Sequence, residues 1–391
     1  MKILVLNAGS SSLKCQYFID RKSTVTALIE RIGEKEGEAT LHYQEQTFTH
    51  KAPIVNHFEA LTLLDSLFEA AGILDDFSQI DVVSHRVVHG GEHFSAPVTL
   101  NTEVIETIEK LIPLAPLHNP ANLEGIYAFL KAYPALRQVA VFDTAFHQTL
   151  PAHAYHYAIP LSLKEKYAVR RYGFHGTSHS YVSRMAADSL HLPYERLNLI
   201  TLHLGNGASM AAVQNGHCID TSMGLTPLEG LIMGTRSGDL DPAVIAYLTR
   251  CGFSITEVEH LLNKESGLKG ITGTNDMREI LSMSESGDAH AILALTMYVY
   301  RIVKYIGAYA AILGSVDAIV FTGGIGEHAS QIREKICERL ALFGIEIDEE
   351  KNRCLGAEGG EIHHLGSRSA LLVIPTNEEL EIALQTEALL S

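Results

Sequence analysis

The chain has 391 residues, which exceeds the size of one typical hydrophobic core, so two domains are expected. Apolar residues make up 46% and charged residues 19% of the chain, a balance that excludes a disordered or fibrous protein. The formal net charge of −16 disfavours nucleic acid and anionic membranes as partners, because both need a positive protein face. An anionic substrate would therefore need a local cluster of cationic side chains.

The cysteines and the apolar stretches indicate a cytoplasmic protein. The five cysteines are scattered without a C-x-x-C pair, which is typical of reduced thiols. The apolar run at the N-terminus is too short for a secretory signal. Residues 291–313 form the most apolar later stretch, but Arg301 and Lys304 interrupt it. A buried or interface helix is therefore favoured there over a membrane span.

The chain opens with a strand–turn–strand pattern. Residues 3–6 form a short apolar run, residues 7–12 (NAGSSS) are small and polar, and residues 13–19 form a second extended run.

The same pattern recurs roughly half a chain later. Residues 199–204 run into the turn at 205–209 (GNGAS), and residues 210–213 run out of it. Strand–turn–strand units are common, so this likeness alone could be chance. A weak internal repeat at this distance nevertheless indicates a duplicated domain.

Each half also holds a later apolar strand that ends in a turn. Residues 139–142 run into a turn that begins at Asp143, and residues 318–321 run into residues 322–326 (TGGIG). The pairing of early and late patterns in both halves strengthens the prediction of a duplication.

Helical periodicity fills the intervals between these strands. Asn101 and Asn377 are candidate N-caps, and Pro113 is a candidate stop signal. Strands that alternate with helices predict an α/β architecture, with a domain boundary near residues 151–160. Helices are predicted over residues 102–112, 243–250, 254–263, 289–313, 331–343 and 378–390.

Small turns after strands are candidate phosphate sites, because their backbone N–H groups are exposed. Residues 7–12, 205–209 and 323–326 form such turns; each alone is most often only a turn, but matching positions in both halves strengthen the signal. Lys14 either reaches a phosphate at the first turn or is a solvated strand residue. Neither a P-loop, nor the third glycine of a dinucleotide fingerprint, nor a protein-kinase signature is present.

Histidines and charged residues cluster in short motifs. Arg86 lies in SHRVVHGGE, His118 in PLHNP and His175 in RRYGFHGTSH, and each histidine alone is most often a hydrogen-bonded structural residue. Zinc is disfavoured, because glycines break the helical spacing of the histidine pairs and no H-E-x-x-H pattern is present. Asp143 ends a strand and could line a crevice at the strand ends, although a lone carboxylate is more often structural.

Residues 220–242 (DTSMGLTPLEGLIMGTRSGDLDP) form a long stretch without regular periodicity. Gly, Pro and Asp are typical of surface loops, but long irregular stretches inside compact domains are usually functional. Its apolar residues argue against a freely solvated loop, so the stretch is interpreted as an active-site wall that carries Arg236.

Motifs along nearly the whole chain, in the same order, resemble those of the acetate kinases. This family belongs to the sugar kinase/Hsp70/actin superfamily, whose duplicated core agrees with the internal repeat. The motifs are LNAGSSSLK (6–14), HRVVHGGE (85–92), PLAPLHNPAN (113–122), FDTAFHQTLP (142–151), RRYGFHGTSH (170–179), HLGNGAS (203–209), DTSMGLTPLEGLIMGTRSGDLDP (220–242), FTGGIGE (321–327) and PTNEEL (375–380).

The resemblance implies an α/β fold of two duplicated actin-like ATPase (ribonuclease H-like) domains with a central cleft. Residues 1–150 with 376–391 would form the N-terminal domain, and residues 151–375 the nucleotide-binding domain. The implied reaction is ATP + acetate ⇌ ADP + acetyl phosphate, with Mg²⁺ or alternatively Mn²⁺, in a homodimer. Separately from the resemblance, the apolar helix at 291–313 is expected to form part of the dimer interface.

The resemblance also assigns roles to individual residues. Asn7 and Glu378 would place the metal. Asp143, His175 and Arg236 would be catalytic, and Arg86, Val88 and Leu117 would bind the substrate. The nucleotide would be held by Lys14, His203, Leu204, Gly205, Asn206, Gly207, Asp276, Met277, Arg278, Gly323, Gly324, Ile325, Gly326 and Glu327.

Physical chemistry agrees with this assignment. Phosphoryl transfer needs positioning and charge neutralisation more than covalent help, and we expect in-line transfer in a closed cleft. A carboxylate nucleophile is already ionised at neutral pH, so an orienting or electrostatic role is favoured for Asp143 over that of a general base.

Two alternatives remain open. A propionate or other short-chain acyl kinase shares nearly all the motifs; Val88 favours acetate, because in the family a smaller residue there accompanies longer acids. One methylene gives only ~1–3 kcal/mol of discrimination, so some activity on propionate is expected. A non-catalytic or chaperone-like nucleotide-binding protein would need a peptide-binding appendage, and no such segment follows the core.

Overall fold

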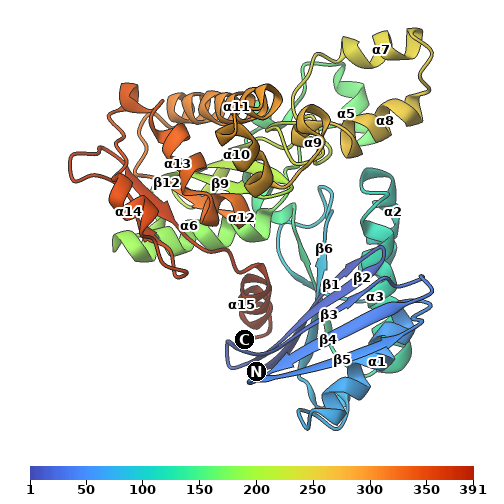
Figure 1. The fold of residues 1–391 in the computed structure, drawn as a ribbon. Helices are drawn as coiled ribbons and strands as arrows, with labels where there is room; N and C mark the ends of the chain where they lie inside the picture. Colours follow the sequence, from blue (N-terminus) through green and yellow to red (C-terminus); the bar gives the residue numbers. More distant parts are fainter. The chain divides into compact units, whose positions relative to one another are not determined.

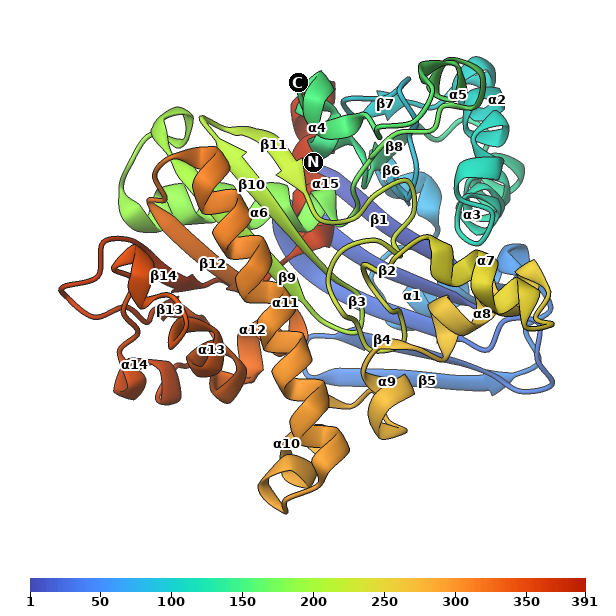
Figure 2. The same ribbon diagram turned by 90° about the horizontal axis from the view of Figure 1, so that it is seen from above.

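The computed structural model describes all residues, 1–391. The chain divides into two compact units. The first comprises Met1–Phe146 and Asn377–Ser391, and the second comprises His147–Thr376. Each unit is built on one β-sheet with helices packed against it (Figures 1 and 2).

The first unit has an eight-stranded sheet in the order β5-β4-β3-β2-β1-β6-β8-β7. Strands β1 to β5 are antiparallel neighbours, whereas β1, β6 and β8 run parallel. The strands are β1 (Lys2–Gly9), β2 (Ser12–Ile19), β3 (Lys22–Glu30), β4 (Gly37–Tyr43), β5 (Gln46–Ala52), β6 (Val82–Val87), β7 (Val98–Thr99) and β8 (Gln138–Phe142). The helices are α1 (His57–Ala70), α2 (Thr102–Lys110), α3 (Asn119–Ala132) and α15 (Glu378–Leu390).

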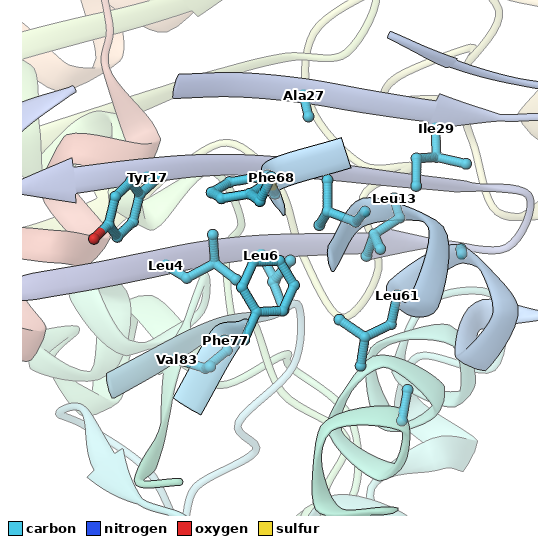
Figure 3. Close-up of a cluster of buried hydrophobic side chains, with 14 of the residues drawn as sticks. Leu4, Leu6, Leu13, Tyr17, Ala27, Ile29, Leu61, Phe68, Phe77 and Val83 are labelled. Atoms are coloured by element: carbon cyan, nitrogen blue, oxygen red, sulfur yellow. The ribbon is translucent and has the colours of Figure 1, made fainter. Parts of the chain in front are cut away.

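Residues of β1 are buried on both faces of this sheet, which explains the continuous apolar run at the start of the chain. Leu4 and Leu6 pack with Leu61 and Phe68 of α1, as Figure 3 shows. The alternating residues Ile3 and Val5 pack on the opposite face, against Ile382 and Ala383 of α15. The last helix of the chain is therefore part of the first unit's core.

The second unit has a six-stranded sheet in the order β11-β10-β9-β12-β14-β13. Helices α6 and α11 cover opposite faces of it (Figures 1 and 2). The strands are β9 (Asn198–Leu204), β10 (Ala208–Gln214), β11 (His217–Thr221), β12 (Ala318–Thr322), β13 (Gly360–Glu361) and β14 (Ala370–Val373). The helices are α4 (Ala152–Tyr155), α5 (Leu161–Tyr167), α6 (Gly176–Leu190), α7 (Ala243–Arg250), α8 (Ile255–Lys264), α9 (Gly267–Thr272), α10 (Met277–Glu285), α11 (Ala289–Leu313), α12 (Gly323–His328), α13 (Ser330–Cys337) and α14 (Glu349–Arg353).

The two units share one strand topology. In the first, β1, β2 and β3 form an antiparallel meander, and β6 and β8 then add in parallel on the other side of β1. In the second, β9, β10 and β11 form the same meander, and β12 and β14 add in parallel beside β9. The internal repeat predicted from the sequence is therefore a repeat of the fold.

Two predicted turns are shorter in the structure, and the one predicted over residues 205–209 ends where β10 begins, at Ala208. Strand β1 continues through Asn7 to Gly9, and Gly9 pairs directly with Ser12, so only two residues form the turn. Asn7 therefore lies in a strand, paired with Lys14, because small residues fit a tight hairpin without ending the strand early. The predicted turn after β12 is also wrong from Gly323 onward, where α12 begins.

Helix boundaries follow the predictions with two exceptions. Helix α2 ends at Lys110, because Pro113 is accommodated in a 3₁₀ turn at Ile112–Leu114. The helix predicted over residues 331–343 ends at Cys337, and Ala341–Phe343 forms a separate 3₁₀ turn. The apolar spacing continued across this break and masked it.

Helix α11 has the length and composition that could cross a membrane. Its side chains Ala294, Tyr298 and Ile302 are buried, and the helix packs against β9 and β10. A core helix of an α/β domain passes the same test of length and composition, and this packing identifies α11 as such a helix.

Candidate active site

An arginine–carboxylate pair lies at the carboxyl ends of neighbouring parallel strands in the first unit. Arg86 is near the end of β6, and Asp143 directly follows β8. The Arg86 Nε donates to Asp143 Oδ1 at 3.1 Å, and its Nη2 donates to Oδ2, so the pair is bidentate. Asp143 is 1% exposed and the Arg86 side chain 18%.

Two more predicted residues join this pair. The Arg86 Nη1 donates to Oδ1 of Asn7 at 3.3 Å, and the Arg86 Nε lies 3.8 Å from Oε2 of Glu378. These residues come from opposite ends of the chain, on β1 and on the first turn of α15. The structure thus brings together Asn7, Arg86, Asp143 and Glu378.

The charges around Arg86 keep its guanidinium ionised. Burial lowers the pKa of Arg86, but the charges of Asp143 and Glu378 raise it by more, so the net shift is upward. A single guanidinium serves two carboxylates here, which leaves excess negative charge. Such a cluster attracts a further cation.

The oxygen donors at this cluster fit a divalent cation. No group of three or more His, Cys, Asp or Glu side chains is arranged to hold a metal by itself. Mg²⁺ is commonly bound through one or two carboxylates together with substrate phosphates. The amide oxygen of Asn7 and the carboxylate of Glu378 match that incomplete donor set.

The segment after β6 is held against the start of α3. The backbone N–H of Val88 donates to Oδ1 of Asn122 at 3.0 Å. Asn119 accepts from the N–H of His89 and donates to its carbonyl, both at 3.1 Å. Val88 is buried, whereas Leu117 is 66% exposed. A contact between substrate and Leu117 would therefore bury a side chain that is otherwise exposed to solvent.

Lys14 is paired within the first unit. Its Nζ lies 2.5 Å from Oε1 of Glu379 in the first turn of α15, and its side chain is 53% exposed. If Lys14 binds a phosphate, its ammonium group would contact both that phosphate and the carboxylate of Glu379.

In the second unit, His175 and Arg236 converge on the turn between β9 and β10. A Cβ added to Gly207 would lie 3.4 Å from Nε2 of His175 and 3.6 Å from Nη1 of Arg236. The absence of a side chain at Gly207 therefore leaves room beside both groups. His175 has φ 55° at the N-terminus of α6, and its ring lies 4.3 Å from that of His203.

The Arg236 guanidinium contacts no carboxylate. Its Nη1 donates to the carbonyl of Pro227 at 3.2 Å and lies 3.6 Å from the sulfur of Met233. Burial lowers the pKa of Arg236, but a guanidinium stays protonated in proteins. A half-buried cation without a carboxylate partner is suited to an anionic ligand.

The loop that carries Arg236 is fixed to its surroundings. Arg171 donates to three successive backbone carbonyls, from Thr221 to Met223, at 2.9 to 3.2 Å, and to Oε1 of Glu229 at 2.6 Å. Arg301 of α11 donates to the carbonyl of Gly230 at 2.7 Å. With Met223, Leu231, Ile232 and Met233 buried, the stretch is a packed wall and not a solvated loop.

Close packing joins this wall to the turn between β9 and β10. The N–H of Gly234 donates to the carbonyl of Asn206 at 2.9 Å. A Cβ on Gly234 would lie 2.0 Å from Oδ1 of Asn206, so only glycine fits there without displacing that side chain. The same Oδ1 accepts from Asn275 at 2.8 Å.

A pocket of about 600 Å³ opens beside this turn, a volume typical of small-molecule sites. It contains seven of the predicted nucleotide-binding residues and four that sequence reasoning missed. The predicted residues are Gly205, Asn206, Asp276, Met277, Arg278, Gly324 and Ile325, and the others are Asn275, Leu281, His328 and Ala329. Asn275, His328 and Ala329 lie within two residues of recognised motifs, and this proximity was the available signal.

An exposed ion pair stands at the edge of the pocket. Asp276 caps α10 and binds Arg278 through contacts of 3.0 and 2.6 Å. Hydrogen bonds from the Arg278 side chain and backbone lower the pKa of Asp276 to about 2.

Other predicted nucleotide residues support the pocket without lining it. Glu327 Oε1 accepts from the N–H of Gly323 at 2.8 Å and from that of Thr376 at 3.1 Å, so this carboxylate caps the start of α12. Leu204 is fully buried, and His203 Nδ1 lies 2.8 Å from Oγ of Ser178. Gly207 and Gly326 are likewise outside the pocket lining.

The fold is that of phosphotransferases with a duplicated actin-like ATPase core. The chain belongs to the acetokinase family, whose model matches residues 2–384. The duplicated α/β fold predicted from the sequence is confirmed, and the protein is an enzyme, a kinase of a family that acts on acetate.

Named relatives and solved structures agree with this family. The chain is 58% identical to the acetate kinase of Sulfurovum sp. (strain NBC37-1), covering 100% of this chain and 99% of the relative. The crystal structure of Porphyromonas gingivalis acetate kinase is similar at a TM-score of 0.95, with 44% identity and 100% coverage of both chains. A propionate kinase from Francisella tularensis subsp. tularensis SCHU S4 is similar at a TM-score of 0.91, with 44% identity and 98% coverage of both chains.

Proposed function

We propose that the protein transfers the γ-phosphoryl group of ATP to the carboxylate of acetate, reversibly and in line, giving acetyl phosphate and ADP. The observation that carries this proposal is the convergence of His175 and Arg236 on Gly207, beside a pocket of nucleotide size. Phosphoryl transfer needs positioned positive charge around the moving group more than covalent help. Both side chains supply N–H donors at that point.

Arg86 binds the acetate carboxylate in this proposal. Its planar guanidinium suits bidentate contacts with a carboxylate, and Asp143 already fixes its orientation. Acetate is ionised at neutral pH, so no strong general base is needed. Asp143 therefore orients and neutralises Arg86, while buried Val88 and exposed Leu117 border the methyl group.

His175 and Arg236 stabilise the charge that spreads over the transferring phosphoryl oxygens. Donors fixed before the reaction are most effective, because they need no reorganisation during it. Arg236 is held by the packed wall, and His175 by Ser209.

Mg²⁺ bound by Asn7 and Glu378 would neutralise phosphate charge when ATP is present, and Mn²⁺ is an alternative occupant. The nucleotide itself lies against the residues that line the pocket, with the exposed Asp276–Arg278 pair at its edge. ATP, ADP, acetate and acetyl phosphate are the small-molecule partners; nucleic acid and membrane are not.

The proposal includes a cytoplasmic homodimer built from two-domain subunits. The division of the chain after Phe146 and after Thr376 supports domains of residues 1–150 with 376–391 and of residues 151–375. Helix α11 supports a role in dimerisation, because apolar side chains stay exposed along it. They are Ile292, Leu293, Met297, Tyr300 and Ile312.

Acetate is favoured over propionate as the substrate, although structural likeness alone does not separate them. The Porphyromonas gingivalis acetate kinase and the Francisella tularensis propionate kinase are equally similar in sequence to this chain, at 44%. The buried side chain of Val88 favours the shorter acid. One methylene changes discrimination by only ~1–3 kcal/mol, so propionate is a secondary substrate.

The test is to trap acyl phosphate with hydroxylamine in the presence of ATP, Mg²⁺ and a panel of short-chain acids. We expect hydroxamate with acetate at the highest kcat/KM and a weaker signal with propionate. A higher kcat/KM for propionate would reassign the substrate. The absence of hydroxamate with every acid would overturn the proposed function and favour a nucleotide-binding protein without this activity.

A further inference from the structure

A continuous chain of hydrogen bonds runs behind His175, away from Gly207. The Nδ1 of His175 lies 2.9 Å from Oγ of Ser209, which lies 2.8 Å from Nε2 of His179. The Nδ1 of His179 in turn lies 2.7 Å from Oγ1 of Thr201. Three of these residues, Thr201, His179 and Ser209, are fully buried.

The fold explains why this chain forms. His175 is the N-cap residue of α6 and His179 lies in its first turn, and both rings contact the hydroxyl of Ser209. Thr201 and Ser209 lie on the antiparallel strands β9 and β10. The helix therefore places its two imidazoles beside hydroxyl groups of the sheet.

The buried ring of His179 is neutral. Burial lowers its pKa well below the usual range, and the nearby rings of His147 and His203 lower it further. His147 is itself held, with Nε2 2.9 Å from the Phe174 carbonyl and Nδ1 3.2 Å from the Cys218 sulfur. A neutral imidazole has one donor and one acceptor, so its two contacts must run in the same direction along the chain.

Two directions keep both nitrogens of His179 paired, but only the first satisfies every buried group. In the first, Thr201 donates to His179 Nδ1, His179 Nε2–H donates to Ser209, and Ser209 donates to His175 Nδ1. In the second, all three bonds are reversed, and the buried Thr201 hydroxyl has no acceptor for its own hydrogen. A buried donor or acceptor that stays unpaired is costly.

We propose that His179 and Ser209 are positioning residues that keep a proton on Nε2 of His175, the nitrogen beside Gly207 and Arg236. With His175 neutral, the first direction makes Nδ1 the acceptor and leaves the proton on Nε2. With His175 protonated, the second direction holds Nδ1–H, and Nε2 still carries a proton. In both states the ring presents a donor to a phosphoryl group.

The second direction with a neutral His175 is the unfavourable state. It would place a lone pair of Nε2 toward phosphoryl oxygens, where two acceptors repel. The relay disfavours this state already in the resting protein, because the second direction leaves the buried hydroxyl hydrogen of Thr201 unpaired. This inference rests on the proposed function only for its catalytic consequence, because the position of the proton is a property of the resting protein.

The direct test is NMR of the unliganded protein with ¹⁵N-labelled histidine, with the His175 signals assigned by their loss in His175→Asn. We expect neutral His175 to carry its proton on Nε2 in the wild type, and to lose this preference in Ser209→Ala. A neutral His175 protonated on Nδ1 in the wild type would overturn the proposal. The readout needs no kinase activity, so its failure is distinct from a failure of the proposed function.

A kinetic test separates positioning from folding. We expect Ser209→Ala to lower kcat about tenfold, the effect of losing one hydrogen bond, with the KM values for ATP and acetate within twofold of the wild type. Ser183→Ala is the matched control, since Ser183 is a buried serine of α6 that bonds the Ser180 carbonyl and Tyr194. Equal kcat values for Ser209→Ala and Ser183→Ala would contradict the relay.

A second pair of variants covers the case in which Ser209→Ala does not fold. Gln at residue 179 can place an N–H where Nε2 stands, whereas Asn reaches only the position of Nδ1. We expect His179→Gln to retain more kcat than His179→Asn. The reverse order would contradict the relay.

Discussion

Arg86 shows how a single residue serves both the fold and the proposed chemistry. Its guanidinium spans Asp143 and Asn7, and Asp143 is almost completely buried. Removing one partner of such a pair leaves the other charge buried and unpaired, which is strongly destabilising. The substrate site and the stability of the first unit are therefore linked at this residue.

Arg86→Ala is expected to destabilise the first unit by about 3–5 kcal/mol, because it removes the guanidinium that pairs with the buried carboxylate of Asp143. The double variant Arg86→Met/Asp143→Leu removes both charges and should recover much of this loss, while acetate binding stays impaired. Urea unfolding gives the stabilities, and the KM for acetate reports binding. An Arg86→Ala protein as stable as the wild type would show that the pair does not carry this energy.

At the same scale, the sequence motifs identified most of the residues that meet in the structure. The resemblance placed Arg86 and Asp143 in one site, although the strand β6 that carries Arg86 was not predicted. The partners of Arg171 could not be predicted, because they are three backbone carbonyls, which have no sequence signature. The link between His175, Ser209 and His179 also depends on how α6 lies against β9 and β10.

At the scale of elements, the packed wall is the feature on which the phosphoryl site depends; within residues 220–242 it begins after β11 ends at Thr221. It is pinned by Arg171 on one side and by Arg301 and Tyr305 of α11 on the other. Its contact with the turn after β9 leaves no space at Gly234. A change in this contact should reach the nucleotide pocket through Asn206.

Gly234→Ala is expected to raise the KM for ATP about tenfold, because the new methyl group displaces the Asn206 side chain from its hydrogen bond to Asn275. Gly356→Ala is the control, since a Cβ there meets nothing within 4 Å. Steady-state kinetics with varied ATP measures the effect. An unchanged KM in Gly234→Ala would mean that the contact does not shape the pocket.

Element types were more predictable than their ends. Helices such as α7, α11 and α15 follow from apolar periodicity and their capping or flanking residues. The turn at Ser10 and the start of α12 at Gly323 could not be predicted from such patterns, because runs of small residues are compatible with strand, turn and helix. Tertiary packing decides among these states.

At the scale of the whole molecule, each unit contains buried histidines that folding keeps neutral. Burial lowers the pKa of both His85 and His89 in the first unit to about 4, and that of His179 in the second unit well below its usual range. The unfolded chain binds protons at these residues near pH 6.5, whereas the folded chain does not. Both units should therefore lose stability as the pH falls below 6.5.

The thermal unfolding midpoints of both units are expected to decrease as the pH is lowered from 7.5 to 5. For His85 the shift from 6.5 to about 4 corresponds to about 2 kcal/mol lost at pH 5. Burial raises the pKa of Asp65 and Asp220, which opposes the effect at lower pH, so the test stops at pH 5. Scanning calorimetry of the wild type and of His85→Gln checks this, and the midpoint of the variant should decrease less with pH. Midpoints that are constant across the range would contradict the expectation.

The duplication itself was the most predictable property of the whole chain. Matching strand and turn patterns in the two halves correspond to the same strand topology in both sheets. Two further features were implied by the resemblance to the acetate kinases and not by the patterns of either half. The last helix completes the core of the first unit, and the nucleotide pocket draws residues from three separated segments of the second.

The central claim is that this chain moves a phosphoryl group by charge stabilisation, with Arg236 as a principal donor. The most direct measurement is the kcat of Arg236→Ala in the hydroxamate assay with saturating ATP and acetate. We predict a decrease on the order of 10³, as for an arginine that stabilises a phosphoryl transition state, with a wild-type unfolding midpoint. A kcat close to that of the wild type would contradict the account.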